Sequence, residues 1–376
     1  MPMSESSEQA DIGTPSGAPL AFAFSGSGGE YFRIWIVNLL LTIATLGVYS
    51  AWAKTRRLQY FYRNTRLAGA SFDFRGQPQA ILRGRILAIL LLGIVFAALG
   101  TSIEDGILAG ALVLAAVPWI MRSALRFRLS NTWYRGLPFG FDGTPGKAYL
   151  IYLLPLGVFF FSDIVDELAP ESLLSTALFL AYFGWPWMHG AMRRYQHRHL
   201  VYGDQRAGFP LSLNALARPY VRIVAVAVLG LVALMVLFLV MAWAGVFVPG
   251  TAAEDRIIRG TVMMCGCLFV MLGLPFTAVR MTNLAWSATA FPGVRIACAI
   301  PPAGYLRLQT VNWMLTLLTL GLFRPFAAVR TWRYRLSHMH VHAVGGVGLT
   351  ARYAAPANRA ATGDGLADIA GIDLSW

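Results

Sequence analysis

The side chains that could carry chemistry in this sequence include amide and hydroxyl groups embedded in apolar runs. An asparagine is followed by threonines four and seven residues later in two separate runs, which places the three side chains on one face of a helix. The residues are Asn38, Thr42, Thr45, Asn312, Thr316 and Thr319. Such a face predicts either a polar membrane lining for a solute or ion, or interhelical hydrogen bonds that hold helices together. The sequence leaves both alternatives open.

Five arginines beside the same apolar runs form a second group. Their guanidinium groups could contact an anionic lipid headgroup or another anion, but long basic side chains also anchor helices at a membrane surface without any ligand. These residues are Arg33, Arg56, Arg57, Arg307 and Arg330.

Three alternating histidines, His338, His340 and His342, form a third group. In an extended segment they would present three imidazoles on one face, which makes them a weak candidate for a zinc or copper site. No cysteine or carboxylate lies beside them in the sequence, so a partly solvated interfacial segment is the stronger alternative. The sequence therefore predicts no cofactor and no resident metal.

The composition indicates where these groups reside. The chain has 376 residues, of which 57% are hydrophobic and only 13% charged. Soluble domains of average composition have about twice that share of charged residues. Long apolar blocks with few charges are typical of a multi-pass membrane protein.

Charge is distributed unevenly between the connecting segments. Basic residues outnumber acidic ones by 31 to 18, and they gather in the segments 54–85, 122–147 and 191–222. The short turns between these segments are acidic, so the positive-inside rule makes the arginine-rich segments cytoplasmic. Membrane phospholipids are the expected partners and a small solute is a further one. Nucleic acid is not expected, since the arginines form no single patch.

Six apolar stretches are long enough to be membrane spans, which need about 20 residues each. They are residues 85–103, 106–121, 148–165, 172–190, 221–247 and 261–279. None of them holds an acidic residue deep in the span, which disfavours an ion-coupled pump. Motifs of nucleotide-binding, zinc-protease or serine-hydrolase sites are also missing. We therefore expect no enzymatic activity.

Internal similarity suggests a modular chain. Residues 31–60 and 305–334 share twelve identities without a gap. Residues 64–76 (NTRLAGASFDFRG) also align with residues 131–143 (NTWYRGLPFGFDG). The alternation Phe-x-Phe-x-Gly in these loops predicts short β-hairpins on the cytoplasmic side.

The two related apolar runs, 31–53 and 305–328, conflict with simple spans, because a crossing would put arginine-rich ends outside the cell. We expect both runs to break at Thr-Leu-Gly (45–47 and 319–321) into re-entrant or tilted helical pairs. The predicted fold class is an all-α multi-pass membrane protein of tandem helical hairpins, with short cytoplasmic β-hairpins and two broken segments. The predicted domains are a disordered tail 1–20, a repeat-built membrane domain 21–345 and a disordered tail 346–376.

The first module also carries a family resemblance. Phe24-x-Gly26, the run Leu-Thr-x-x-Thr-Leu-Gly-x-Tyr at 41–49, Trp52, Arg56-Arg57, Tyr60 and Asn64-Thr65 resemble the YjgN-like family of bacterial inner-membrane proteins. The resemblance covers roughly residues 20–345. It implies a multi-pass protein of the bacterial inner membrane and brings no known activity or catalytic residues.

The expected function is transport-type, as a permease or channel-like protein for a small solute or lipid. The broken segments and the asparagine and threonine faces favour it. The alternative is a non-transporting scaffold or phospholipid-binding protein, and a membrane enzyme ranks third. The sequence names neither the substrate nor the oligomeric state.

Overall fold

The computed structural model describes residues 19–245 and 252–343. Within this part, the order of a strand, an outgoing and returning helical segment, and a second strand occurs five times along the chain. The first unit contains β1 (Leu20–Phe24), α1 (Gly28–Ala44), α2 (Ser50–Arg63) and β2 (Thr65–Leu67). The second contains β3 (Ala70–Phe74), α3 (Pro78–Thr101), α4 (Ile103–Ser130) and β4 (Thr132–Tyr134).

The other three units follow the same order. The third contains β5 (Leu137–Phe141), α5 (Pro145–Leu168), α6 (Leu173–Tyr182), α7 (Trp185–Arg198) and β6 (Leu200–Tyr202). The fourth contains β7 (Gln205–Arg206), α8 (Leu213–Trp243), α9 (Ala252–Leu268), a π-helical turn (Phe269–Gly273), α10 (Leu274–Ser287) and β8 (Ala290–Phe291). The fifth contains β9 (Val294–Cys298), α11 (Pro302–Leu318), α12 (Arg324–Ser337) and β10 (Met339–Ala343).

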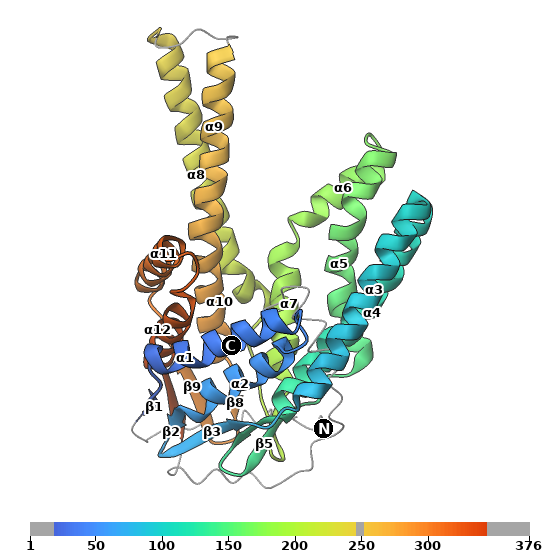
Figure 1. Ribbon diagram of the computed structural model, residues 1–376. Helices are drawn as coiled ribbons and strands as arrows, with labels where there is room; N and C mark the ends of the chain where they lie inside the picture. The colour runs from blue at the N-terminus through green and yellow to red at the C-terminus, as the bar shows by residue number, and fades with distance from the viewer. Residues whose placement is uncertain (1–18, 246–251, 344–376) are drawn as a thin grey trace, which may run out of the picture.

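The strands of all five units join into one antiparallel sheet of ten strands in the order β7-β6-β5-β4-β3-β2-β1-β10-β9-β8. Its two edge strands meet where Gly208 and Ala290 exchange backbone hydrogen bonds of 2.7 and 3.1 Å. The sheet therefore curls into a near-closed barrel with the helices rising from one rim (Figure 1). The fold is mostly helical and contains the predicted hairpins, but an all-α class with short separate hairpins is incomplete. Pairing within the units, such as β3 with β4, joins the hairpins into one sheet.

Tight turns connect successive units at the opposite rim. Ala68-Gly69 and Arg135-Gly136 have positive φ at both positions, 47° and 78° in the first turn and 48° and 77° in the second. This pattern is a type I′ turn, which suits the twist of a two-stranded hairpin and favours glycine at its second position. The hairpins predicted within residues 64–76 and 131–143 are thus confirmed as β2–β3 and β4–β5.

The Phe-x-Phe-x-Gly motif connects the first strand to the outgoing helix in the first three units. In β3 the ring of Phe74 is fully buried and folds back over Gly76, where an added β-carbon would lie 2.5 Å from the ring. Gly26 and Gly143 meet the rings of Phe24 and Phe141 in the same way. The glycine is therefore required by the close approach of the ring two residues before it.

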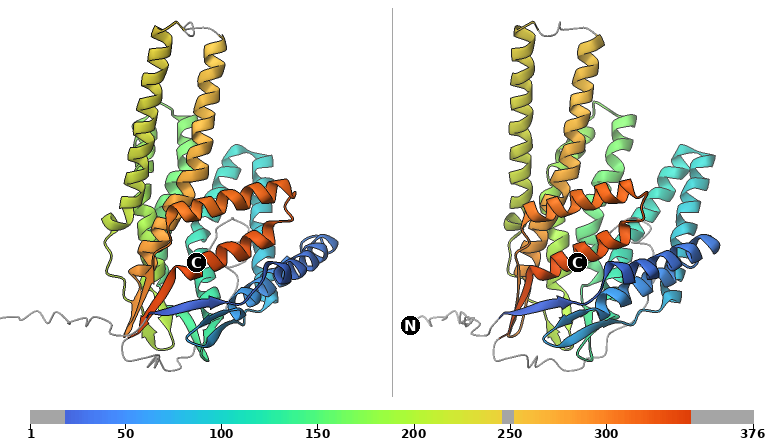
Figure 2. Two further views of the ribbon diagram at one scale, coloured as in Figure 1. Left: turned by 90° about the vertical axis from the view of Figure 1, so that its left-hand side faces the viewer. Right: turned by 60° about the vertical axis from the view of Figure 1, so that its left-hand side comes forward.

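Both broken apolar segments are helical pairs. Leu46 and Leu320 adopt a left-handed conformation with φ of 50°, and the glycine after each has φ of 93°. Helices α1 and α11 end there, as is usual at a left-handed C-terminal position. At about 25 Å, a helix of 17 residues is shorter than the roughly 30 Å hydrocarbon core. Figure 2 shows α11 and α12 running across the molecule, at a steep angle to the long helices α8 and α9.

In the described residues, five helices are long and apolar enough to cross a membrane. They cover Pro78–Thr101, Glu104–Ser130, Pro145–Leu168, Leu213–Trp243 and Arg256–Ser287. One of the six predicted spans, residues 172–190, is wrong as a continuous helix, because α6 ends at Tyr182 and α7 begins at Trp185. The break coincides with Gly184 and with Pro186, which fits only the first turn of a helix.

The predicted tails, 1–20 and 346–376, lie outside the described residues, apart from Pro19 and Leu20. Leu20 begins β1 and pairs with Val341 of β10.

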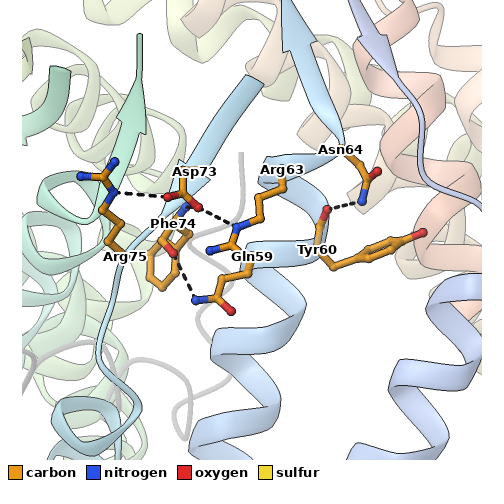
Figure 3. A network of polar contacts seen from close by, with 7 residues as sticks. All are labelled: Gln59, Tyr60, Arg63, Asn64, Asp73, Phe74 and Arg75. Carbon is orange, nitrogen blue, oxygen red and sulfur yellow. Dashed lines mark hydrogen bonds and ion pairs between the residues drawn. The ribbon is translucent and has the colours of Figure 1, made fainter. Parts of the chain in front are cut away.

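An ion pair between Asp73 and Arg63 joins the first unit to the second (Figure 3). Asp73 of β3 accepts a 2.8 Å hydrogen bond from Nε of Arg63 at the end of α2 and a 3.2 Å hydrogen bond from Nε of Arg75. Burial raises the pKa of Asp73, but hydrogen bonds from both arginines outweigh it and hold the pKa below its usual value. The carboxylate is therefore ionised at neutral pH.

We expect Asp73→Asn to destabilise the protein by less than about 1 kcal/mol at pH 7, as is typical for exposed ion pairs. A lowered pKa in the folded state gives stability that is complete above the unfolded pKa and is lost as the pH falls through the folded value. The difference in melting temperature between wild type and variant should thus shrink in acid. Glu171→Gln, at an exposed position, is the control. A difference that stays constant down to pH 2.5 would contradict the ion-pair assignment.

Candidate functional site

The barrel contains a partly open cavity of about 220 Å³. Because side chains alternate between the two faces of a strand, every second residue of each strand points into the barrel. The strand residues that line this space include two threonines, Thr65 and Thr132. The others are apolar or aromatic: Leu20, Phe22, Leu67, Phe72, Tyr134, Phe139, Leu200, Tyr202, Phe291, Val294, Ile296, Met339, Val341 and Ala343. We call this space the lumen cavity.

One wall of the lumen cavity is aromatic. The rings of Phe72 and Tyr134 stack with centroids 4.6 Å apart, and those of Phe139 and Tyr202 lie 4.8 Å apart. The ring of Phe22 continues this wall at 6.2 Å from Phe72. The wall thus offers flat apolar surfaces to a ligand.

The two tyrosines of this wall use their hydroxyl groups elsewhere. Tyr134 donates to the carbonyl oxygen of Leu67 at 2.7 Å, and Tyr202 donates to that of Tyr134 at 3.0 Å. Burial raises the pKa of Tyr134 and raises that of Tyr202 to about 12. Both phenols are therefore neutral, and each hydroxyl donates its proton to a carbonyl of the strand two positions away in the sheet, β2 for Tyr134 and β4 for Tyr202, rather than to the lumen cavity.

The helix-side end of the lumen cavity is formed by the last turns of the returning helices. Tyr62 of α2, Leu129 of α4, Trp286 of α10 and Trp332 of α12 line it. These helices return to the sheet at the rim from which the outgoing helices rise (Figure 1). The threonine hydroxyls there are hydrogen-bonded. Thr65 and Thr132, which begin β2 and β4, donate at 2.7 and 2.9 Å to carbonyls in the last turns of the preceding helices.

The predicted asparagine and threonine faces lie outside the lumen cavity, on α1 and α11. The hydroxyls of Thr42 and Thr316 donate to the carbonyls of Asn38 and Asn312 at 2.6 Å. The Asn312 amide donates to Thr331 Oγ1 of α12 at 3.2 Å, an interhelical bond of the kind foreseen as the alternative.

The other threonine pair stabilises the break between the helices. The hydroxyls of Thr45 and Thr319 accept 2.9 Å hydrogen bonds from the backbone N–H groups of Tyr49 and Phe323, just before α2 and α12 begin.

The side-chain oxygens of Asn38 and Asn312 are buried and have no hydrogen-bond partner among the described residues. A polar lining by these residues stays a prediction.

The predicted anion-binding arginines also lie away from the lumen cavity and are exposed: Arg33, Arg56, Arg57, Arg307 and Arg330. Two of them occupy equivalent positions over aromatic rings. The guanidinium carbon of Arg56 lies 5.6 Å from the ring centroid of Tyr49, and that of Arg330 lies 5.9 Å from Phe323. Their contact with lipid headgroups stays a prediction.

The three alternating histidines do not share one environment. His338 ends α12 and its Nδ1 donates to the carbonyl of Tyr334 at 2.8 Å. His340 and His342 lie on β10 at the positions between its lumen residues. Within the described ranges 19–245 and 252–343, no three His, Cys, Asp or Glu side chains come together in a metal-binding arrangement. The weak metal candidate gains no geometric support.

Sequence reasoning missed the lumen residues, although one pattern pointed to them. The first phenylalanine of each Phe-x-Phe motif, Phe22, Phe72 or Phe139, lines the lumen cavity. The second, such as Phe74, packs under the helices, where it contacts Tyr62 and Phe127. Period-two alternation thus separates an inner from an outer aromatic set.

Comparison with known proteins places the chain in a family. A family model described as "Bacterial protein of unknown function (DUF898)" matches residues 19–369, which is almost the whole chain. The chain belongs to the DUF898 family. No solved structure matches it.

Two curated relatives of this DUF898 chain are both named "Inner membrane protein YjgN". The protein from Salmonella typhimurium (strain LT2) is 30% identical over 139 residues, which is 35% of this chain and 34% of the relative. That from Escherichia coli (strain K12) is 32% identical over 143 residues, 36% of this chain and 35% of the relative. The match thus spans about a third of each relative's length. With the five apolar helices, these matches identify an inner-membrane protein.

Proposed function

We propose that this protein binds a membrane lipid and holds a hydrocarbon segment of it in the lumen cavity. The observation that carries the proposal is the apolar and aromatic wall of a cavity of about 220 Å³ inside the barrel. An apolar cavity of about 150 Å³ accepts a benzene molecule, so by proportion this one accommodates roughly nine carbon atoms. Binding of such a segment is favoured by the removal of its apolar surface from water.

The position of the lumen cavity supports a lipid rather than a polar solute. Its helix-side end adjoins the rim from which the apolar helices rise, so a lipid chain has a short path from the bilayer. A small polar solute would find few partners, because the hydroxyls of Tyr134 and Tyr202 donate to strand carbonyls. The transport-type expectation thus becomes transfer of a lipid between the bilayer and the barrel. The proposal includes no enzymatic step.

Filling the lumen cavity should remove the bound lipid. Val294 of β9 lines the cavity, and its neighbour Arg295 is exposed. We expect Val294→Trp to lower the fraction of protein that retains a lipid by at least tenfold, as measured by native mass spectrometry of the full chain released from detergent. Arg295→Trp adds the same ring outside the barrel and should retain the wild-type fraction.

The melting temperature of both variants shows whether they are folded. A folded Val294→Trp protein that keeps its lipid, or a wild-type protein that never carries one, would contradict the proposal.

A further inference from the structure

One charged group touches the otherwise apolar lumen cavity. Of the described residues that line it, Arg335 in the last turn of α12 is the only charged one. Its Nη2 donates to the hydroxyl of Tyr305 at 2.8 Å, and its guanidinium carbon lies 5.5 Å from the centroid of that ring. The contact with Tyr305 holds the cation at the wall, at the helix-side end of the cavity.

The lining of the lumen cavity also includes a buried hydroxyl group. Tyr62 lines the same end of the cavity and is 6% exposed, and its hydroxyl group has no hydrogen-bond partner among the described residues. Its ring packs against Trp332 with centroids 6.2 Å apart. Trp332 precedes Arg335 by three residues and therefore lies on the same face of α12. A buried hydroxyl without a partner is unfavourable, so it points to an acceptor supplied by a ligand.

We infer that the ligand of the lumen cavity is an amphiphile with one acidic group, a carboxylate or a phosphate, which Arg335 and Tyr62 bind. This inference rests on the proposed function and adds the chemical class of the ligand. A guanidinium group presents parallel N–H donors that match the oxygens of either anion, and a phenol donates to the same oxygens. Among the described residues that line the cavity, none is acidic, so none of them would repel the anion.

The arrangement also fixes the direction of binding. The acidic group occupies the helix-side end, and the hydrocarbon chain extends along Phe72, Phe139 and Tyr202 toward the tight turns. The polar end of the ligand therefore stays at the rim nearest the bilayer.

The test compares three probes of equal chain length: decanoate, decyl phosphate and 1-decanol. Binding to the full chain in amphipol, after removal of endogenous lipid, is measured by isothermal titration calorimetry. We expect wild-type protein to bind at least one of the two anions about tenfold more tightly than decanol, as charge-assisted hydrogen bonds are strong. If decanoate binds more tightly than decyl phosphate, the acidic group of the ligand is a carboxylate; if decyl phosphate binds more tightly, it is a phosphate.

Variants assign the preference to the two residues. Arg335→Gln should remove the preference for the anion while binding of decanol changes little. Tyr62→Phe should weaken anion binding several-fold without lowering the melting temperature, because the hydroxyl it removes has no partner. Arg333→Gln is the matched control, since Arg333 lies on the same helix and donates to Gly26 outside the cavity.

The outcomes separate the two proposals. If decanol and the anions bind equally and Arg335→Gln has no effect, the inference about the acidic group is wrong and the lipid-binding proposal stands. If no probe binds to the wild-type protein, the lipid-binding proposal itself fails, and this inference fails with it.

Discussion

Replacing Phe74 with alanine is expected to lower the free energy of unfolding by about 3–5 kcal/mol, the usual effect of removing a buried aromatic ring. The ring is fully buried. It lies 6.1 Å from Tyr62 and 6.5 Å from Phe127, and it covers Gly76. One side chain thus joins a strand, the helix before it, the helix that returns to the next strand and the start of an outgoing helix.

Thermal or denaturant unfolding in detergent measures this effect. The matched control is Phe96→Ala, because the ring of Phe96 is 72% exposed on α3 and loses few protein contacts. Its effect should stay within about 0.5 kcal/mol. Equal losses in the two variants would show that the Phe-x-Phe-x-Gly motif does not form the core described above.

The second large effect concerns membrane topology and is all-or-none. In a chain whose three native cysteines are replaced, a membrane-impermeant maleimide added to whole cells should label Glu104→Cys, at the start of α4. It should not label Arg66→Cys in β2 until the cells are lysed. The reason is that the arginine-rich segments 54–85, 122–147 and 191–222 contain the strands β2 to β7 and the tight turns between them, and the positive-inside rule keeps these segments in the cytoplasm.

A third position tests the short hairpin α1–α2. Leu46 at its tip is 95% exposed, yet the hairpin is shorter than the hydrocarbon core. Leu46→Cys should therefore stay unlabelled in whole cells. Labelling at this position from outside would mean that the first hairpin crosses the bilayer, and labelling of Arg66→Cys would reverse the orientation.

The local features of the fold could be predicted from the sequence because short stretches of chain determine them. The turns Ala68-Gly69 and Arg135-Gly136, the hairpins around them and the breaks at Thr-Leu-Gly all depend on a few consecutive residues. The continuous span 172–190 was predicted wrongly because apolar composition outweighed the break at Gly184 and Pro186.

The barrel could not be predicted, because its closure depends on pairs that are distant in sequence. Leu20 pairs with Val341, and Gly208 with Ala290. Strands of two to five residues carry too little pattern to specify such partners. The lumen cavity depends on this closure, so sequence reasoning placed the polar groups of α1 and α11 at the site instead. There the hydroxyls of Thr42 and Thr316 are hydrogen-bonded within their own helices.

The pairing of β1 with β10 has a further consequence for the architecture. Leu20 at the start of the first strand pairs with Val341 in the last strand, so the described chain enters and leaves the barrel at one seam between these two strands. The units therefore form a ring in which the first and the last described unit are neighbours, although the chain itself is linear. A circularly permuted chain, with a linker across the seam and new termini at another tight turn such as Arg135-Gly136, would keep the same order of strands with little rearrangement.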